Sequence, residues 1–203
     1  MARIAIFCDG TWNSPTMDQP THVVRLFQKT PRTNAQHTCY FEGVGTATKQ
    51  AGFFGKALMK VGGGAFGWGL NDAIKQAYAA LCEQYEAGDE IFIFGFSRGA
   101  YTARSLAGMI RKCGIVPDRV EIAYLGIWDT VGSLGIPAPL LGPVANLWNA
   151  KYRFHDTILS SMVKSARHAV ALDERRVFYK PSLWDNLEAS RDDAGLNKGD
   201  RTE

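Results

Sequence analysis

Short apolar runs alternate with amphipathic segments along this chain, and this pattern restricts the fold more than any other feature. Each run is six to nine residues long and ends at or beside a glycine or an acidic residue, as is typical of buried strands of a parallel sheet. The runs cover residues 3–8, 37–45, 90–96 and 120–128. Such alternation predicts an α/β fold, a mostly parallel sheet with helices on both faces, over a single domain of residues 1–203.

Four segments between and after these runs have helical spacing of their apolar residues. Thr21 and Asn71 stand where N-caps are expected, and Gly114 stands where a helix would end. The expected helices cover residues 21–28, 71–85, 101–113 and 155–173. Residues 177–180 offer at most one more short strand after residue 129.

Two apolar segments have no clear period and are rich in glycine or proline. Residues 52–69 and 133–148 are therefore expected to be loop or lid insertions. Residues 190–203 are polar and are expected to form a frayed tail.

Composition excludes several classes of protein. The net charge of +3 comes from basic residues scattered among acids, which argues against a nucleic-acid partner. The four cysteines are widely spaced in apolar contexts, which indicates reduced core residues and neither disulfides nor a metal site. The apolar start is too short for a signal peptide or a membrane span, so we expect synthesis in the cytoplasm and any export to need no signal peptide. No cofactor is expected.

The candidate chemistry begins at Gly95-Phe96-Ser97-Arg98-Gly99, a G-x-S-x-G string between a predicted strand and a predicted helix. In a nucleophile elbow the serine stands on a strained turn, and small residues on either side let the strand and the helix approach each other. Ser97 is therefore the candidate nucleophile. The alternative is a small residue in a structural turn.

A nucleophilic serine needs a base and an acid that orients it. Asp129 follows the next predicted strand and is the candidate acid, or else a residue that caps a turn. Chain order in this fold is serine, acid, histidine, which leaves His155 and His168. His168 is the stronger candidate for the base, although a histidine on a helix face is more often structural.

The oxyanion hole is expected to use the backbone N–H of Arg98 and one from Gly10 or Thr11, in the loop after the first strand. Asp9 and Trp12 of the same loop are candidates for binding substrate. The charge of Asp9 would oppose an oxyanion. Asp9 is therefore more easily explained as an acceptor for backbone N–H groups, as a partner of Arg98 or Arg104, or as a cation ligand.

Five strings carry a resemblance to a known family: FCDGTWN, YFEGVGT, GDEIFIFGFSRGAYTARSLAGMI, LGIWDTVGS and HAVALDERR. They resemble an uncharacterised α/β-hydrolase family of bacteria and fungi that is related to the phospholipase effectors of the type VI secretion system. The resemblance runs from Ile6 to about Trp184. It implies a serine esterase or lipase in which Ser97 carries over as nucleophile, and Asp129 and His168 as candidates only.

This family usually continues with a further strand and a histidine-containing motif that these 203 residues do not include. The base is therefore His168, His155 or a histidine beyond residue 203. In the last case the chain is either a fragment or catalytically incomplete. We expect a serine hydrolase that cleaves a small-molecule or lipid ester, foremost that of a lipid or phospholipid, with transient contact to a membrane surface. The alternative is a catalytically incomplete binding or scaffold module with the same fold.

Overall fold

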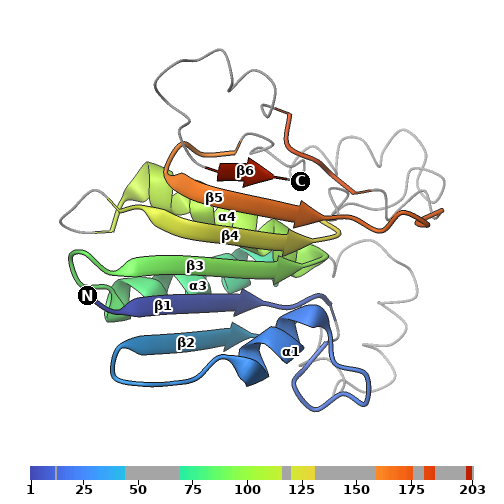
Figure 1. Ribbon diagram of the computed structural model, residues 1–203, viewed down its shortest axis with the longest axis horizontal. Helices are drawn as coiled ribbons and strands as arrows, with labels where there is room; N and C mark the ends of the chain where they lie inside the picture. Colours follow the sequence, from blue (N-terminus) through green and yellow to red (C-terminus); the bar gives the residue numbers. More distant parts are fainter. Residues whose placement is uncertain are drawn as a thin grey trace.

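The computed structural model describes residues 1–11, 13–43, 69–115, 120–130, 159–175 and 181–185, together with the backbone of residues 200–202. Six strands of this part form one sheet in the order β2-β1-β3-β4-β5-β6, and every neighbouring pair is parallel (Figure 1). The strands are β1 (Arg3–Cys8), β2 (Gln36–Phe41), β3 (Glu90–Phe96), β4 (Ile122–Trp128), β5 (Val163–Ala169) and β6 (Asp200–Thr202). The predicted α/β-hydrolase-like fold is confirmed.

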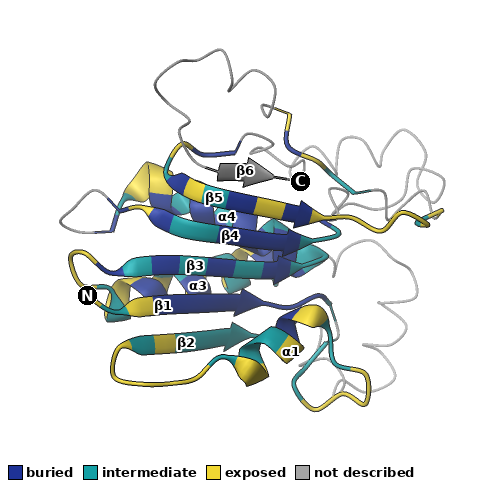
Figure 2. Ribbon diagram, in the orientation of Figure 1, coloured by how far each residue is buried: buried dark blue, intermediate teal, exposed yellow. Residues whose placement is uncertain are grey.

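In the described part of the chain, three helices cover the two faces of this sheet. α1 (His22–Lys29) lies on one face, and α3 (Leu70–Gln84) and α4 (Arg98–Cys113) lie on the other (Figure 1). Both faces of β1 are therefore covered, and its residues are buried from Ile4 to Cys8 (Figure 2). This explains why β1 is a continuous apolar run rather than an alternating one.

The helix ends agree with the sequence at some caps and differ at others. Thr21 caps α1, because its hydroxyl accepts a 3.1 Å hydrogen bond from the amide of Val24. α4 ends at Gly114, whose φ of 68° favours glycine. The predicted cap Asn71 is wrong, since α3 begins one residue earlier after Gly69. α4 also begins at Arg98 rather than at residue 101, because the G-x-S-x-G turn leads directly into the helix.

The two sides of the sheet have separate apolar clusters. Alternation along β3 sends Ile91 and Ile93 to the α3/α4 side, while Phe92 and Phe94 face α1. On the α1 side the ring of Phe94 stacks on the ring of Phe7 at a centroid distance of 5.1 Å. Strand β3 is thus held from both sides, and its C-terminal end has a well-defined place.

The predicted helix over residues 155–173 is wrong in its described part, which contains strand β5 paired in parallel with β4. The sequence Val-Lys-Ser-Ala-Arg-His-Ala has few apolar residues, so its alternation is weak, but Ala166 and His168 are buried and Lys164 and Arg167 are exposed. Without β5, strand β4 would be an open edge of the sheet. The strand conformation of residues 163–169 is favourable because pairing satisfies the backbone N–H and C=O groups of both strands. The expected polar tail also differs, since residues 200–202 pair with β5.

The remaining predictions are mixed. The predicted insertion at 133–148, nearly all of 52–69 and the strand candidate at 177–180 lie outside the described residues. All four cysteines are free thiols, as expected. The prediction that all of them are core residues is wrong for Cys82 and Cys113, which are exposed. Within the described ranges, no helix combines the length and the apolar character needed to cross a membrane.

Candidate active site

Ser97 occupies a sharp turn between β3 and α4. Its φ of 54° and ψ of −117° lie in a region that residues other than glycine rarely adopt. The turn is held at its start by a 2.8 Å hydrogen bond from the amide of Ser97 to the carbonyl oxygen of Trp128 on β4. Ser97 is half-buried and precedes the first residue of α4, where the helix dipole favours negative charge.

The glycines on either side of Ser97 are needed for steric reasons. A Cβ atom on Gly95 would lie 2.5 Å from the carbonyl oxygen of Gly99 and 2.6 Å from the Cα of Ala100. A Cβ atom on Gly99 would overlap with the carbonyl oxygen of Cys8, at the end of β1. The strand, the helix and the end of β1 can therefore meet at this turn only if both positions lack side chains.

Asp9 holds the loop that follows β1. Its Oδ1 accepts a 2.7 Å hydrogen bond from the amide of Gly10, and its Oδ2 accepts from the hydroxyls of Tyr40 at 2.6 Å and Thr21 at 2.9 Å. Only 3% of Asp9 is exposed. Burial raises the pKa of the carboxyl, and the three hydrogen bonds partly offset that rise.

Of the alternatives for Asp9, the acceptor of a backbone N–H is confirmed. Both oxygens are engaged by neutral donors, and neither the guanidinium of Arg98 nor that of Arg104 is among them. Three donors and burial leave this carboxylate little access to a substrate or a cation. The other candidate for binding substrate, Trp12, lies outside the described residues.

The loop after β1 lies directly against the serine turn. A Cβ atom on Gly10 would come within 2.8 Å of the Phe96 ring, one residue before Ser97. The three residues predicted to supply oxyanion donors, Gly10, Thr11 and Arg98, therefore lie on two segments in contact. The amide of Gly10, however, already donates to Asp9.

Asp129 lies beside the serine turn, at the end of β4. It has a φ of 45°, and it and Ser97 are the two non-glycine residues with positive φ in the described part of the chain. The amide of Asp129 donates to the carbonyl oxygen of Ala169 at 2.9 Å, and its Oδ1 accepts from the amide of Ala171 at 2.6 Å. Strained backbone at two adjacent strand ends is typical of functional sites.

His168 lies one strand further along the sheet, on β5, next to Ile127 of β4. It is 2% exposed, its Nε2 accepts from the amide of Thr130 at 3.4 Å, and its ring meets Trp184 edge-on at 5.4 Å. Burial, and secondarily the charge of Arg104, lowers the pKa of His168 to about 4. Within the described residues, no hydrogen bond joins this imidazole to Ser97 or Asp129, and its Nδ1 has no partner.

The assignment of His168 as the base therefore stays a prediction. Its hydrogen bond with the amide of Thr130 favours a structural role. The imidazole lies against Trp184, and the charge of Arg104 on α4 acts on it. The second candidate, His155, lies outside the described residues.

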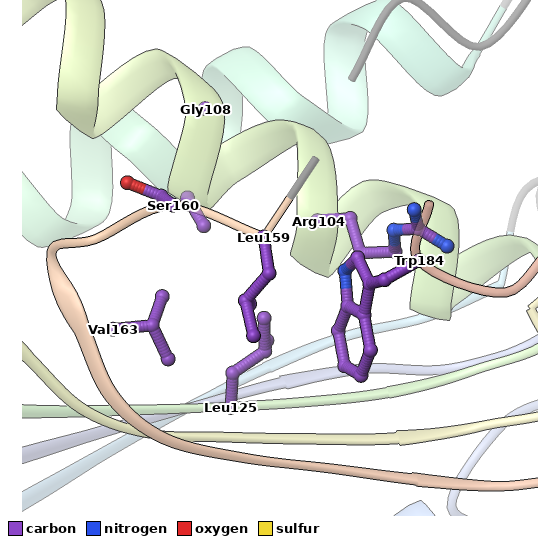
Figure 3. A pocket seen from close by; sticks show the side chains of 8 residues that line it. Arg104, Gly108, Leu125, Leu159, Ser160, Val163 and Trp184 are labelled. Carbon is purple, nitrogen blue, oxygen red and sulfur yellow. The ribbon is translucent and has the colours of Figure 1, made fainter. Parts of the chain in front are cut away.

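Arg104 holds residues 181–185 near His168. This buried guanidinium donates to the carbonyl oxygen of Ser182 at 2.6 Å and lies 5.2 Å from the centre of the Trp184 ring. A cavity of about 10 Å³ lies between Arg104, Trp184, Leu125 and Leu159 (Figure 3). It has room for about one water molecule and none for an acyl chain.

Three residues at this edge of the sheet were not selected from the sequence for the site. Tyr40 and Thr21 hold Asp9, and the exposed His22 places its ring 6.0 Å from that of Trp128. Thr21 had a signal, since it was expected to cap α1. Tyr40 had only its place near the end of a predicted strand.

Comparison with known proteins gives one family match and two similar proteins. The model of the family described as "T6SS, Phospholipase effector Tle1-like, catalytic domain" matches residues 2–121 and 116–202. An uncharacterized protein of Saccharomyces cerevisiae is 26% identical over 229 residues, covering 88% of this chain and 32% of the relative. A crystal structure of an uncharacterized protein from Pseudomonas aeruginosa aligns with a TM-score of 0.49 and 19% identity, covering 87% of this chain and 36% of that chain.

The chain thus spans about a third of the length of each of these two proteins. The family model, in contrast, matches nearly every residue of it. The chain therefore belongs to the family whose model is described as the Tle1-like catalytic domain.

Proposed function

We propose that this domain is a serine hydrolase that cleaves a carboxylic ester of a lipid, foremost a phospholipid, through an acyl-enzyme on Ser97. The observation that carries the proposal is the backbone of Ser97, with a φ of 54° on a turn that two glycines allow between a parallel strand and a helix. A nucleophile elbow has this construction. A serine that only ended a strand would have no need of a strained conformation.

In the proposed reaction the Oγ of Ser97 attacks the ester carbonyl, and a base takes its proton. The N–H of Arg98 and one N–H of the loop after β1 stabilise the oxyanion. The tetrahedral intermediate expels the alcohol, which receives the proton, and leaves an acyl-enzyme that water hydrolyses.

Asp129 is the proposed acid. Its Oδ1 is held by the amide of Ala171, while its Oδ2 has no donor among the described residues and can accept from an imidazole. The contact of His168 with Thr130 makes it a weaker candidate for that imidazole than the sequence suggested. His155 is the other candidate within these residues, and a histidine beyond residue 203 in a longer chain is the third.

Two further features favour a lipid as substrate. The family is one of phospholipase effectors, and residues 52–69 and 133–148 are apolar segments that the sequence predicts as loops. We propose that these segments bind the acyl chain and contact the membrane surface transiently. Delivery by a type VI secretion system, which needs no signal peptide, accords with the family.

Labelling with a fluorophosphonate probe tests the proposal against the alternative of a scaffold module. The expected result is covalent labelling of the wild-type chain and release of fatty acid from phosphatidylcholine or phosphatidylethanolamine vesicles. Both should be lost in Ser97→Ala and kept in Ser105→Ala, a matched change further along α4. Turnover that survives in Ser97→Ala would sink the proposal, and a wild-type chain that is neither labelled nor active would favour the scaffold.

A further inference from the structure

We propose that the side chains of Asp9, Tyr40 and Thr21, here called the latch, orient the loop after β1. In this orientation the backbone N–H of Thr11, and not that of Gly10, is the second donor to the oxyanion. This inference rests on the proposed function of Ser97. It makes Asp9, Tyr40 and Thr21 positioning residues, and it gives the oxyanion hole a definite pair of donors, the amides of Arg98 and Thr11.

The latch joins three parts of the fold at one carboxylate. Gly10 belongs to the loop itself, Thr21 precedes α1, and Tyr40 lies on β2. The backbone adds a second link, since the amide of Asp9 donates to the carbonyl oxygen of Phe41 at 3.0 Å. A buried carboxylate with three donors is held in one orientation, and the loop that begins with it is held as well.

The latch decides which amide of the loop can face a substrate. The N–H of Gly10 points back to Oδ1 of Asp9 at 2.7 Å, so it cannot also point to an oxyanion. The next amide is that of Thr11, for which no acceptor is found among the described residues, and the buried Thr11 hydroxyl likewise has no partner there. Thr11 is thus the first residue of the loop whose N–H is available for the reaction.

The far side of the loop is closed by backbone. The amide of Asn13 donates to the carbonyl oxygen of Gly10 at 3.0 Å, and the amide of Gly43 donates to the carbonyl oxygen of Asn13 at 3.2 Å. A Cβ atom on Gly43 would overlap with the carbonyl of Gly10. The Gly10 peptide therefore has little freedom to rotate and present its own N–H.

The same arrangement explains how a carboxylate is tolerated next to a developing negative charge. The charge of Asp9 is buried and directed at Tyr40, Thr21 and Gly10 rather than at the serine turn. Of the titratable neighbours, Cys8 stays neutral because burial raises its pKa to about 12, and Tyr40 stays a donor because burial and the nearby Asp9 and Glu42 raise its pKa.

Tyr40→Phe tests the latch, because it removes one donor to Asp9 and leaves the fold and Ser97 in place. Tyr78→Phe is the matched control: the Tyr78 hydroxyl also donates a 2.6 Å hydrogen bond, but to the carbonyl oxygen of Gly114, beyond the end of α4 and away from the serine turn. We expect kcat to fall about 10-fold in Tyr40→Phe, with KM changed less than about 2-fold, and neither to change in Tyr78→Phe.

Inhibitors separate positioning from a merely structural effect. The Ki of a lipid trifluoromethyl ketone, whose adduct carries an oxyanion, should rise in Tyr40→Phe by the same factor as kcat falls, while the Ki of an uncleavable ether lipid stays constant. Equal weakening of both inhibitors, or no change in either, would overturn the latch.

Nuclear magnetic resonance of the ¹⁵N-labelled wild-type chain provides a test that needs no variant. On formation of the trifluoromethyl ketone adduct, the amide proton of Thr11 should shift downfield and that of Gly10 should stay in place. The opposite result would overturn the assignment of Thr11. Activity that survives in Ser97→Ala would instead overturn the proposed function, so the two failures can be told apart.

Discussion

The amide of Ser97 donates a 2.8 Å hydrogen bond to the carbonyl oxygen of Trp128, and this contact sets the candidate nucleophile beside the candidate acid. Trp128 ends β4, and Asp129 follows with a φ of 45°. The two residues with strained backbone are thereby brought to adjacent strand ends although 31 positions separate Ser97 from Trp128 in the sequence.

Gly99→Ala should destabilise the domain strongly, because its Cβ would overlap with the carbonyl oxygen of Cys8, which is backbone and cannot move away cheaply. We expect a loss of about 3 kcal/mol or more in the free energy of unfolding, measured in urea. Gly114→Ala is the control: its φ is 68°, but nothing lies within 4 Å of the new Cβ. It should lose only about 1 kcal/mol, and equal losses in both variants would contradict the steric account.

Ser97→Gly should make the domain more stable and inactive at once. Glycine adopts a φ of 54° without the steric cost that serine bears, so relief of strain should add about 1 kcal/mol to the free energy of unfolding. Thermal unfolding measures the gain, and fluorophosphonate labelling measures the lost reactivity. Ser97→Ala keeps the strain and should lose reactivity without the gain; a Ser97→Gly variant less stable than wild type would argue against strain at this turn.

Asp129→Asn should lower kcat by about 10³-fold to 10⁴-fold while the fold is kept. The amide oxygen can still accept from the Ala171 N–H, but the uncharged side chain no longer stabilises an imidazolium. Hydrolysis of a short-chain aryl ester measures the loss, and Asp18→Asn, at an exposed position of a loop, is the control. If kcat stays within about 10-fold of wild type, Asp129 is not the acid.

The stability of the domain should fall as the pH falls from about 6.5 to about 4. His168 is neutral in the folded protein above its pKa of about 4, whereas the unfolded chain already takes up the proton near 6.5. Between these values the contribution of His168 is lost at up to about 1.4 kcal/mol per pH unit. Urea unfolding at pH 7 and pH 5 measures it.

His168→Gln should lose that part of the pH dependence, while His37→Gln, at an exposed position on β2, should keep it. The variant also decides the role of His168 in the reaction. A supporting residue should lower the rate of fluorophosphonate labelling by less than about 10-fold, whereas removal of the base should abolish it. Complete loss of labelling in a folded His168→Gln would restore His168 as the base.

Local sequence was a good guide where one segment carries its own signal. The run Glu90–Phe96 was predicted with both of its ends correct, and Thr21 was predicted to cap α1. The G-x-S-x-G string indicated a turn whose glycines are required for close approach, and the structure bears out that steric requirement. Signals of this kind come from residue types that stand close together in the chain, such as glycines at a turn or a hydroxyl at a helix start. A sequence shows these residues directly.

The sequence failed at β5 and at His168 for one physical reason. Residues 163–169 alternate too weakly to predict a strand, and it is the unpaired edge of β4 that makes the strand the favourable state. His168 was then given the surroundings of a helix face, whereas on β5 it contacts Thr130 and Trp184 and lies near the charge of Arg104. The partners of Asp9 were missed likewise, since Tyr40 reaches it only through the pairing of β1 with β2.

The sequence by itself determined the alternation of strands and helices, the family and the position of the serine turn, because these depend on local periodicity, on glycines and on strings of residues. Only the tertiary structure decided that Asp9 is closed off by Tyr40, Thr21 and Gly10, that Asp129 lies next to Ser97, and that His168 supports Thr130. Contacts of this kind join residues that are far apart in the chain. They follow from the order and register of the strands, which no single segment encodes.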